Sequence, residues 1–477
     1  MILRHLYHND LAQASYLVGC AATGEALIVD PNRDIQQYID LAEREGLKIT
    51  KITETHIHAD YVSGSRELAA RTGAELYLSK EGTEDWQYDF AKESGAILIG
   101  EGDVITVGNI RVDVWHTPGH TPEHLSFLVT DTAGADRPMG IFTGDFVFVG
   151  DVGRPDLLEK AAGYENTMEA GGRQLFQSLQ RFKQLDDFVQ IWPGHGAGSP
   201  CGKALGAVPQ STVGYERLFN WALQFEDEDK FVNGVLEDQP EPPVYFAQMK
   251  HVNKVGPAIT SELRDPIMKG LPDIEAAMTA QQPIVDLRPA DKFASGHIPG
   301  TFNISYEKGF VIWAGWLLPY DRPFNVIVDQ QHIDEVTHEL RMIGLDTLES
   351  FWEPAIVDEW KAAGNELGQV KQVTVDQLDE IGDVQIVDVR GATEHADGHI
   401  PGTKNIPVGY VGEKLQEISS DKPVVFHCQT GRRSSIAASV AAAHGRTDIY
   451  NLVGGFSAWE SAGREVESSR EAAAAAS

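Results

Sequence analysis

Two stretches of the chain repeat one another and decide how it divides into domains. Ile284–Ile304 reads IVDLRPADKFASGHIPGTFNI, and Ile386–Ile406 reads IVDVRGATEHADGHIPGTKNI. They share 14 of 21 residues at a constant offset of 102, without a gap, so the chain holds two copies of one module. Each copy begins with a short apolar run that is typical of a strand and continues into a helical stretch. Strands that alternate with helices predict an open parallel α/β sheet in each copy.

The second copy continues into a loop with the composition of a nucleophile site. The run KPVVFH predicts a buried strand, CQTGRR follows from Cys428 to Arg433, and a helical stretch begins at Ser434. A thiol at this turn faces the N–H groups of a helix N-terminus and the guanidiniums of Arg432 and Arg433. Because these groups stabilise an anion, we predict that Cys428 is a thiolate nucleophile served by both arginines.

This second copy resembles the rhodanese sulfurtransferases. The resemblance depends on DVR at 388–390, GHIPG at 398–402, the CxxGxR loop and GGFSAW at 454–459. It implies an active rhodanese domain at 370–465, in which Cys428 carries sulfur as a persulfide. The related dual-specificity phosphatases have a loop one residue longer, so the six residues found here favour sulfur over phosphate.

The first copy lacks a sulfur nucleophile. It keeps DLR at 286–288 and GHIPG at 296–300, but its strand at the nucleophile position reads RPFNVIVDQ. No cysteine lies between residues 201 and 428. We therefore predict an inactive rhodanese-like domain at 255–365.

The region ahead of the repeats offers histidine or aspartate at four predicted strand ends. A Pro-rich acidic stretch, EDQPEPPV at 237–244, predicts a linker that closes an N-terminal domain of residues 1–240. Its chemistry-bearing residues are His56, His58 and Asp60 in THIHADY, His120 in HTPGHT, Asp145 in IFTGD and His195 in IWPGH. Strand-end loops that each present such a residue are how a metal gathers ligands from distant parts of a chain.

These four segments resemble the metallo-β-lactamase superfamily, whose pattern is THxHxD, PGHT, TGD and PxH. The resemblance covers residues 1–240 and implies an αββα sandwich with a metal between the two sheet edges. The family usually has a histidine directly after the aspartate of the first motif, where this chain has Tyr61. A phenol with an ordinary pKa of about 10 is a poor Zn²⁺ ligand, so a two-zinc site is disfavoured. The remaining set of His56, His120 and Asp145 is similar to the facial triad of mononuclear iron(II) oxygenases.

Within the superfamily, the chain is more similar to the persulfide dioxygenases (sulfur dioxygenases). This resemblance implies one Fe(II) per chain, bound by His56, His120 and Asp145. His116 and His124 are competing candidates for one ligand position, and the PGHT motif favours His120. It also implies residues that surround the ligands and orient them: His58, Asp60, Tyr61 and His195.

Two further residues are predicted to lie near the substrate. Arg154, in GRPD, matches an arginine beside the thiol-carrier site of the resembling family, and a guanidinium pairs well with a carboxylate. The alternative for Arg154 is a turn pair with Asp156. Cys201, six residues after His195, is predicted to be a thiol at the mouth of the iron pocket, the alternative being an inert core residue.

Composition excludes several classes of partner. The chain has 477 residues, with 71 Asp and Glu against 39 Lys and Arg and a net charge of −32. So acidic a chain does not neutralise phosphates, which argues against nucleic acid and anionic membranes. Three cysteines make no disulfide framework, and no apolar stretch near the start is long enough to span a bilayer. We expect a cytoplasmic homo-oligomer without signal peptide or membrane anchor, and a disordered tail at 466–477.

Taken as one protein, the chain is predicted to be a persulfide dioxygenase fused to rhodanese domains. Its Fe(II)-dependent half would oxidise a low-molecular-weight thiol persulfide with O₂ to sulfite and thiol. Its rhodanese half would transfer sulfur through Cys428, either forming thiosulfate or using it. The alternative is a di-zinc thioester hydrolase like glyoxalase II, fused to a sulfurtransferase.

Overall fold

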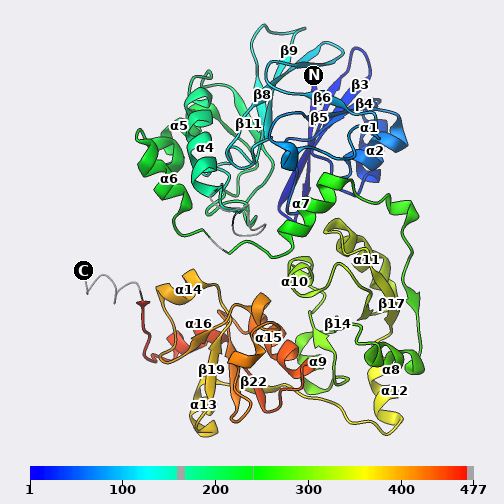
Figure 1. Cartoon of the computed structure of the whole chain (residues 1–477), viewed down its shortest axis with the longest axis vertical. Coiled ribbons are helices and arrows are strands. Elements are labelled where there is room, and N and C mark those ends of the chain that lie inside the picture. The colour runs from blue at the N-terminus through cyan, green and yellow to red at the C-terminus, as the bar shows by residue number, and fades with distance from the viewer. Residues whose placement is uncertain (158, 160–166, 240, 470–477) are drawn as a thin grey trace. The chain divides into compact units, whose positions relative to one another are not determined.

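The computed structural model divides into two compact units (Figure 1). It describes residues 1–157, 159, 167–239 and 241–469. The units are Met1–Leu263 with Arg341–Gly344 (unit 1), and Arg264–Leu340 with Leu345–Ser477 (unit 2). The predicted tail at 466–477 lies outside the described residues from 470 onward.

Unit 1 contains two six-stranded sheets that pack against each other. The first sheet has the spatial order β1 (Ile2–His8), β2 (Gln13–Cys20), β3 (Glu25–Val29), β4 (Lys48–Thr53), β5 (Glu75–Ser79) and β6 (Ile97–Ile99). The second has the order β12 (Ser211–Thr212), β11 (Gln190–Pro193), β10 (Gly140–Gly144), β9 (Leu125–Asp131), β8 (Ile110–His116) and β7 (Val104–Val107). Val18 and Leu27 of the first sheet share a buried cluster with Val112 and Phe127 of the second, which forms the layer between them.

Alternation of apolar and polar residues explains the inner faces of these sheets. In β8, Ile110, Val112 and Val114 are buried, whereas Arg111 between the first two of them is exposed. Successive side chains of a strand point to opposite faces, so this pattern turns one face of the strand toward the core. β10 is buried along its whole length, which places the residue that follows it, Asp145, in a dry environment.

Helices cover the outer faces of both sheets and complete an αββα sandwich (Figure 1). On the first sheet lie α1 (Gln36–Arg44) and α2 (Ser65–Thr72), and on the second lie α4 (Met168–Phe182) and α6 (Glu228–Leu236). Elsewhere in the described residues of unit 1 lie α5 (Val213–Phe219), α7 (Phe246–Val255) and the short 3₁₀ turns η1 (Glu84–Trp86), η2 (Trp221–Gln224) and η3 (Thr260–Glu262). Tyr38 and Leu41 in α1 are spaced to face the same side, and both are buried against the sheet. The predicted sandwich is confirmed.

Unit 2 contains two five-stranded sheets with the same strand order. The first sheet runs β13 (Ile267–Met268), β17 (Leu348–Trp352), β16 (Phe324–Ile327), β14 (Ile284–Asp286) and β15 (Phe302–Asn303). The second runs β18 (Lys371–Val373), β22 (Ile449–Leu452), β21 (Val424–His427), β19 (Gln385–Asp388) and β20 (Lys404–Asn405). Every strand pair in both sheets is parallel. The two parallel α/β modules predicted from the repeat are therefore confirmed.

The helices of unit 2 follow the same repeat. The first copy has α8 (Leu271–Thr279), α9 (Ala290–Ser295), α10 (Phe310–Leu317), η4 (Gln330–His332), α11 (Ile333–Met342) and α12 (Ile356–Ala362). The second has α13 (Val375–Ile381), α14 (Ala392–Asp397), η5 (Val408–Tyr410), η6 (Leu415–Glu417), α15 (Arg432–Ala443) and α16 (Gly455–Ser461). α15 is buried along most of its length because it packs on its own sheet and on β15 of the first copy. Across that contact, the Asn303 N–H donates to Oγ of Ser439 at 2.9 Å.

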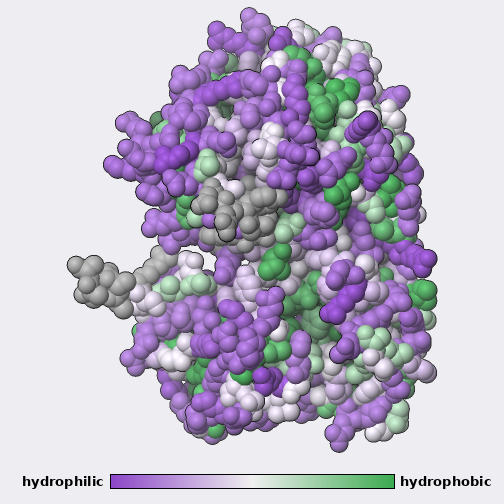
Figure 2. Space-filling view, in the orientation of Figure 1, coloured by the Kyte–Doolittle hydropathy of each residue, from purple (hydrophilic) through white to green (hydrophobic). Residues whose placement is uncertain are grey.

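The surface agrees with the acidic composition. On the face seen in Figure 2, hydrophilic residues dominate and hydrophobic ones form small separate groups. Within the described part of the chain, no helix combines the length and the apolar character that crossing a membrane requires.

Candidate metal centre and sulfur-transfer loop

Three predicted ligands meet in unit 1. His56 follows β4, His120 lies between β8 and β9, and Asp145 follows β10. Their ligand atoms all lie within 4.8 Å of one another, and all three residues are buried. Nε2 of His56 lies 3.9 Å and Nε2 of His120 lies 3.5 Å from Oδ2 of Asp145. The structure thus brings together two imidazoles and one carboxylate from three distant strand ends.

Each of these imidazoles is held through its other ring nitrogen. Nδ1 of His120 lies 3.0 Å from the carbonyl oxygen of Arg154. Nδ1 of His56 lies 2.9 Å from Oγ1 of Thr55, and that hydroxyl itself donates to Asp30. Because these acceptors take the Nδ1 proton, Nε2 keeps the lone pair that a metal ion binds.

The two competing histidines are used differently. His124 accepts a hydrogen bond at Nε2 from the Asp145 N–H at 3.1 Å, and its Nδ1 lies 2.9 Å from Oγ1 of Thr117. Nε2 of His116 lies 2.7 Å from the carbonyl oxygen of Pro122. His124 therefore positions the Asp145 backbone, while His120 lies with the ligand group.

The buried carboxylates of this centre fit a bound cation. Among the described residues, neither oxygen of Asp145 or of Asp60 has a hydrogen-bond partner, although both residues are buried. Buried carboxylates without donors are costly, and a cation compensates them. Although burial acts in the opposite direction, the imidazoles of His195 and His120 hold the pKa of Asp145 below its usual value. Nitrogen and carboxylate donors together suit a divalent transition metal.

A second group of possible ligands adjoins the first. The ligand atoms of Asp60, His195 and Cys201 also lie within 4.8 Å of one another, and all three residues are buried. Nε2 of His195 lies 3.2 Å from Oδ2 of Asp60 and 3.4 Å from Oδ1 of Asp145. Asp145 thus faces the first group with Oδ2 and this group with Oδ1. Cys201 lies within the centre, where burial and the charge of Asp145 raise the pKa of its thiol.

Asp30, at the end of β3, anchors the other side of the centre. Its carboxylate accepts from the Thr55 N–H at 2.7 Å, and its Oδ1 lies 3.1 Å from Nε2 of His58. Burial lowers the pKa of His58, but Asp30 outweighs it and raises that pKa to about 9. Tyr61 donates its hydroxyl to the Asp30 carbonyl oxygen at 3.4 Å, and burial raises its pKa well above the usual value. Tyr61 thus turns its hydroxyl toward the backbone of Asp30.

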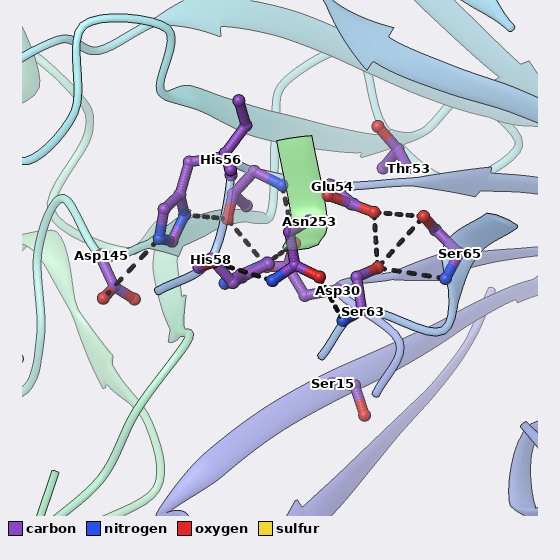
Figure 3. A network of polar contacts seen from close by, with 12 residues as sticks. Ser15, Asp30, Thr53, Glu54, His56, His58, Ser63, Ser65, Asp145 and Asn253 are labelled. Carbon is purple, nitrogen blue, oxygen red and sulfur yellow. Dashed lines mark hydrogen bonds and ion pairs between the residues drawn. The ribbon is translucent and has the colours of Figure 1, made fainter. Parts of the chain in front are cut away.

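Asn253 of α7 holds the loop that carries His56 and His58, as Figure 3 shows. Its Nδ2 donates to the carbonyl oxygens of His58 at 2.8 Å and Tyr61 at 2.7 Å. Its Oδ1 accepts from the Ser63 N–H at 2.9 Å. Asn253 is 1% exposed, so these bonds are shielded from water. Sequence reasoning missed this residue, because a single asparagine in a helix carries no signal of a partner about two hundred residues away.

Arg154 forms the turn pair that the sequence offered as its alternative. The residue is fully buried, and its guanidinium makes two hydrogen bonds of 2.7 Å to the carboxylate of Asp156. Its Nη1 also donates to the carbonyl oxygen of Pro200 at 3.2 Å. Through its own carbonyl oxygen, Arg154 orients His120. A contact between Arg154 and substrate stays a prediction.

In unit 2, the Cys428 loop joins β21 to α15. Cys428 is 1% exposed, and the Gly431 N–H donates to its Sγ at 3.2 Å. Oγ of Ser434 lies 3.5 Å from the same sulfur. The Ser434 hydroxyl donates to Oδ1 of Asn451 at 2.6 Å, so the Gly431 N–H is the donor that faces the sulfur at the helix N-terminus. The role of Cys428 as a nucleophile stays a prediction.

Both arginines of the loop are paired with carboxylates. Arg433 makes two hydrogen bonds, of 2.6 and 2.8 Å, to Glu394 of α14. Nε of Arg432 lies 2.7 Å from Oε1 of Glu307 in the first copy, and its Nη2 donates to the carbonyl oxygen of Lys308. The guanidiniums are thus fixed on opposite sides of the loop. Their partners, Glu394 and Glu307, carry no sequence motif and were missed.

A glycine at the start of α16 makes room for the loop. Gly455 has φ +56°, and a Cβ built on it would lie 2.2 Å from the carbonyl oxygen of Cys428. The next residue, Phe456, donates its N–H to that same oxygen at 2.7 Å. The GGFSAW motif therefore holds the backbone of the nucleophile directly. In the first copy, Val328 follows β16 where Cys428 follows β21, which agrees with an inactive module.

Comparisons with known proteins match both regions of the chain. Residues 8–195 match the family model of the metallo-beta-lactamase superfamily, and residues 372–462 match that of the rhodanese-like domain. The hydroxyacylglutathione hydrolase of Nitrosococcus oceani is 32% identical over 199 residues, which cover 41% of this chain and 66% of that protein. The mitochondrial persulfide dioxygenase of Mus musculus is 29% identical over 236 residues, covering 48% of this chain and 78% of that one.

One solved structure covers more of the chain. A metallo-beta-lactamase from Staphylococcus aureus is 46% identical with a TM-score of 0.69, and the match covers 74% of this chain and 99% of that one. The chain spans a smaller part, 62% and 66%, of two hydroxyacylglutathione hydrolases that it matches.

Replacing Asn253 should loosen the metal loop. Asn253→Ala removes three buried hydrogen bonds, and we expect the affinity for a divalent metal ion to fall roughly 10- to 100-fold, as for other residues that orient ligands. Asn253→Asp keeps the shape of the side chain and one acceptor but loses both N–H donors. Its metal affinity should therefore also fall. Metal titration measures the change, with exposed Asn233→Ala of α6 as the control. An unchanged affinity in both Asn253 variants would remove Asn253 from the metal centre.

Replacing Gly455 should disrupt the Cys428 loop. Gly455→Ala combines left-handed backbone strain of about 1–2 kcal/mol with a clash against the Cys428 carbonyl. Gly463→Ala is a matched control, because Gly463 has φ +67° and open space around it. We expect sulfur transfer to collapse only in Gly455→Ala, while both variants lose free energy of unfolding. Equal transfer rates in the two variants would contradict the steric role of Gly455.

Proposed function

The chain belongs to the metallo-β-lactamase superfamily and carries a rhodanese-like domain, and from this premise we propose that it is a persulfide dioxygenase joined to a sulfurtransferase. The observation that carries the proposal is the presence of two sites in one chain. One is the buried group of His56, His120 and Asp145, and the other is the anion-stabilising loop of Cys428. Both suit chemistry on a sulfur–sulfur bond. The name of the mouse relative supports the same activity.

We propose one Fe(II) per chain, held by Nε2 of His56, Nε2 of His120 and the carboxylate of Asp145. When bound, the ion supplies one-electron chemistry toward O₂ and a Lewis acid for the persulfide sulfur. Tyr61 supports a single ion, because its hydroxyl is turned to the Asp30 carbonyl oxygen.

The proposed oxidation is RSSH + O₂ + H₂O → RSH + SO₃²⁻ + 2H⁺. The chain's own residues orient the ligand imidazoles, exclude water and bind a released proton. Arg154 and Thr55 fix the ligand imidazoles, and the buried walls of the centre exclude water. Nε2 of His195 lies between Asp60 and Asp145, which raise its pKa against the effect of burial. A released proton can therefore be held at that nitrogen.

The sulfurtransferase half would exchange sulfur with sulfite or with a thiol. In the forward direction, sulfite attacks the outer sulfur of the Cys428 persulfide, the bond to Sγ breaks, and thiosulfate and the Cys428 thiolate result. The Gly431 N–H and the α15 N-terminus stabilise the negative charge that returns to Sγ. The small-molecule partners are then a thiol persulfide, O₂, sulfite and thiosulfate.

A second candidate function rests on the group formed by Asp60, His195 and Cys201. A metal there, with another at the first group, would make a dinuclear hydrolase of thioesters, and two relatives are named hydroxyacylglutathione hydrolases. The metal content of protein purified without added metal separates the candidates. One iron per chain favours the dioxygenase, whereas two zincs together with hydrolysis of an S-acyl thiol favour the hydrolase.

Asp145→Ala tests the ligand set. This change removes the carboxylate that faces both histidines, so we expect loss of bound iron and of persulfide-dependent O₂ uptake. Metal analysis and an oxygen electrode measure the two effects, and the Cys428→Ser variant serves as a control that should keep its iron. A variant of Asp145 that retains one iron per chain and normal turnover would exclude this residue as a ligand.

The two activities should be separable by mutation. In Cys428→Ser, the hydroxyl cannot form a persulfide, so sulfur exchange between thiosulfate and sulfite should stop while sulfite release from persulfide and O₂ continues. His120→Ala should do the reverse, with O₂ uptake lost and sulfur transfer kept. Product analysis on both variants checks this. Collapse of sulfite formation in Cys428→Ser with iron still bound would instead show one obligate relay.

A further inference from the structure

Unit 2 contains a cavity between the two module copies, beside the Cys428 loop. Its volume is about 480 Å³, within the range of roughly 300–1,000 Å³ that small-molecule sites occupy. The first copy lines it with Asp291 and Ser295 of α9 and with Glu307. The second copy lines it with Gly431, Arg432 and Ser435, which begin α15. A copy without a cysteine thus supplies one wall of a space next to the sulfur nucleophile.

Gly431 belongs both to the cavity lining and to the loop around the sulfur. Gly431 lines the cavity, and its N–H donates to Sγ of Cys428 at 3.2 Å. A molecule held in the cavity is therefore next to the loop that carries sulfur, although Cys428 itself is buried.

The contacts between the copies show that the cavity is built into unit 2. Ser439 of α15 binds the Asn303 backbone of β15 on the first copy, and Arg432 binds Glu307 and Lys308. On the side of α10, the rings of Trp316 and Tyr410 meet with centroids 5.5 Å apart. Of these contacts, the ion pair of Arg432 with Glu307 joins two residues of the lining across the two copies, which limits the ordering cost of binding.

The charges of the cavity select one kind of ligand. Its lining carries one guanidinium, Arg432, and two carboxylates, Asp291 and Glu307. Arg432 pairs with Glu307, whereas Asp291 has no salt-bridge partner in the described part of the chain. A guanidinium has five N–H donors, so Arg432 can hold Glu307 and still donate to a ligand carboxylate. After the Arg432–Glu307 pair, Asp291 is the remaining charge of the lining, and its carboxylate favours a ligand group with positive charge.

We propose that this cavity seats the carrier portion of a low-molecular-weight thiol with an α-ammonium and a carboxylate group. The ammonium group lies at Asp291 and the carboxylate at Arg432. The first copy, which has no cysteine, thereby selects the thiol that reacts at the second copy. This inference rests on the proposed sulfurtransferase function. In the step it serves, the bound thiolate attacks the outer sulfur of the Cys428 persulfide. The bond to Sγ breaks, its electron pair returns to Sγ, and the carrier leaves as R–S–S⁻, with no net oxidation.

Three acceptor thiols test the proposal on the full chain, loaded with sulfur from thiosulfate. They are cysteine, 3-mercaptopropionate, which lacks the ammonium group, and cysteamine, which lacks the carboxylate. Wild-type protein should show its lowest KM for cysteine. Asp291→Asn should raise the KM for cysteine and cysteamine about three- to fivefold, as expected for one exposed ion pair, and leave 3-mercaptopropionate unchanged. Asp358→Asn, an exposed change on α12 outside the cavity, is the matched control.

Binding of S-methylcysteine, which cannot exchange sulfur, gives a second readout that is independent of turnover. Its Kd should rise by the same factor in Asp291→Asn and not in Asp358→Asn. Equal KM values for the three thiols, or an unchanged KM and Kd in Asp291→Asn, would overturn the assignment of the cavity. The sulfurtransferase proposal would still stand. Failure of wild-type Cys428 to take sulfur from thiosulfate would refute the sulfurtransferase proposal, and this one with it.

Discussion

The metal centre depends on one buried carboxylate that faces imidazoles on two sides. Asp145 follows a fully buried strand, and its oxygens point to His56 and His120 on one side and to His195 on the other. A lone carboxylate at such a depth would be very costly. The Nδ1 atoms of the three histidines are held by Thr55, Arg154 and Ala12, so each Nε2 turns toward the same space as the carboxylate, where a bound cation would compensate the charge. The loops after β4, β10 and β11, and the loop between β8 and β9, carry these residues to one place.

The Cys428 loop, between β21 and α15, depends on backbone and side-chain contacts in place of a group of imidazoles. Here the Gly431 N–H, at a helix N-terminus, donates to Sγ of Cys428. Gly455 makes the close approach of α16 possible, and Glu394 and Glu307 hold the two arginines in place. The described residues of the metal centre lie in unit 1, and those of the Cys428 loop lie in unit 2. Within unit 2, the copy without a cysteine contributes Glu307 and Asp291 and is more than a spacer.

The fold could be predicted because repeated sequence and strand-end motifs report directly on backbone structure. The repeat of residues 284–304 predicted two parallel modules. The sandwich and its ligand group were expected from the resemblance to the metallo-β-lactamase superfamily that the THIHADY and PGHT motifs carry. Residues that act through their neighbours were beyond reach. Asp30 and Asn253 lie far along the chain from the histidines they hold, and such pairs are fixed only by tertiary packing. Cys201 was predicted to be a thiol near the pocket, but its grouping with Asp60 and His195 is apparent only in the folded chain.

The central claim is that the metal centre oxidises a persulfide sulfur with O₂. Its most direct test is the stoichiometry of the full chain loaded with Fe(II) and supplied with a thiol persulfide, measured as O₂ consumed, sulfite released and thiol regenerated. The account predicts one sulfite and one thiol for each O₂. No O₂ uptake from iron-loaded protein, together with hydrolysis of an S-acyl thiol by the zinc-loaded form, would contradict it.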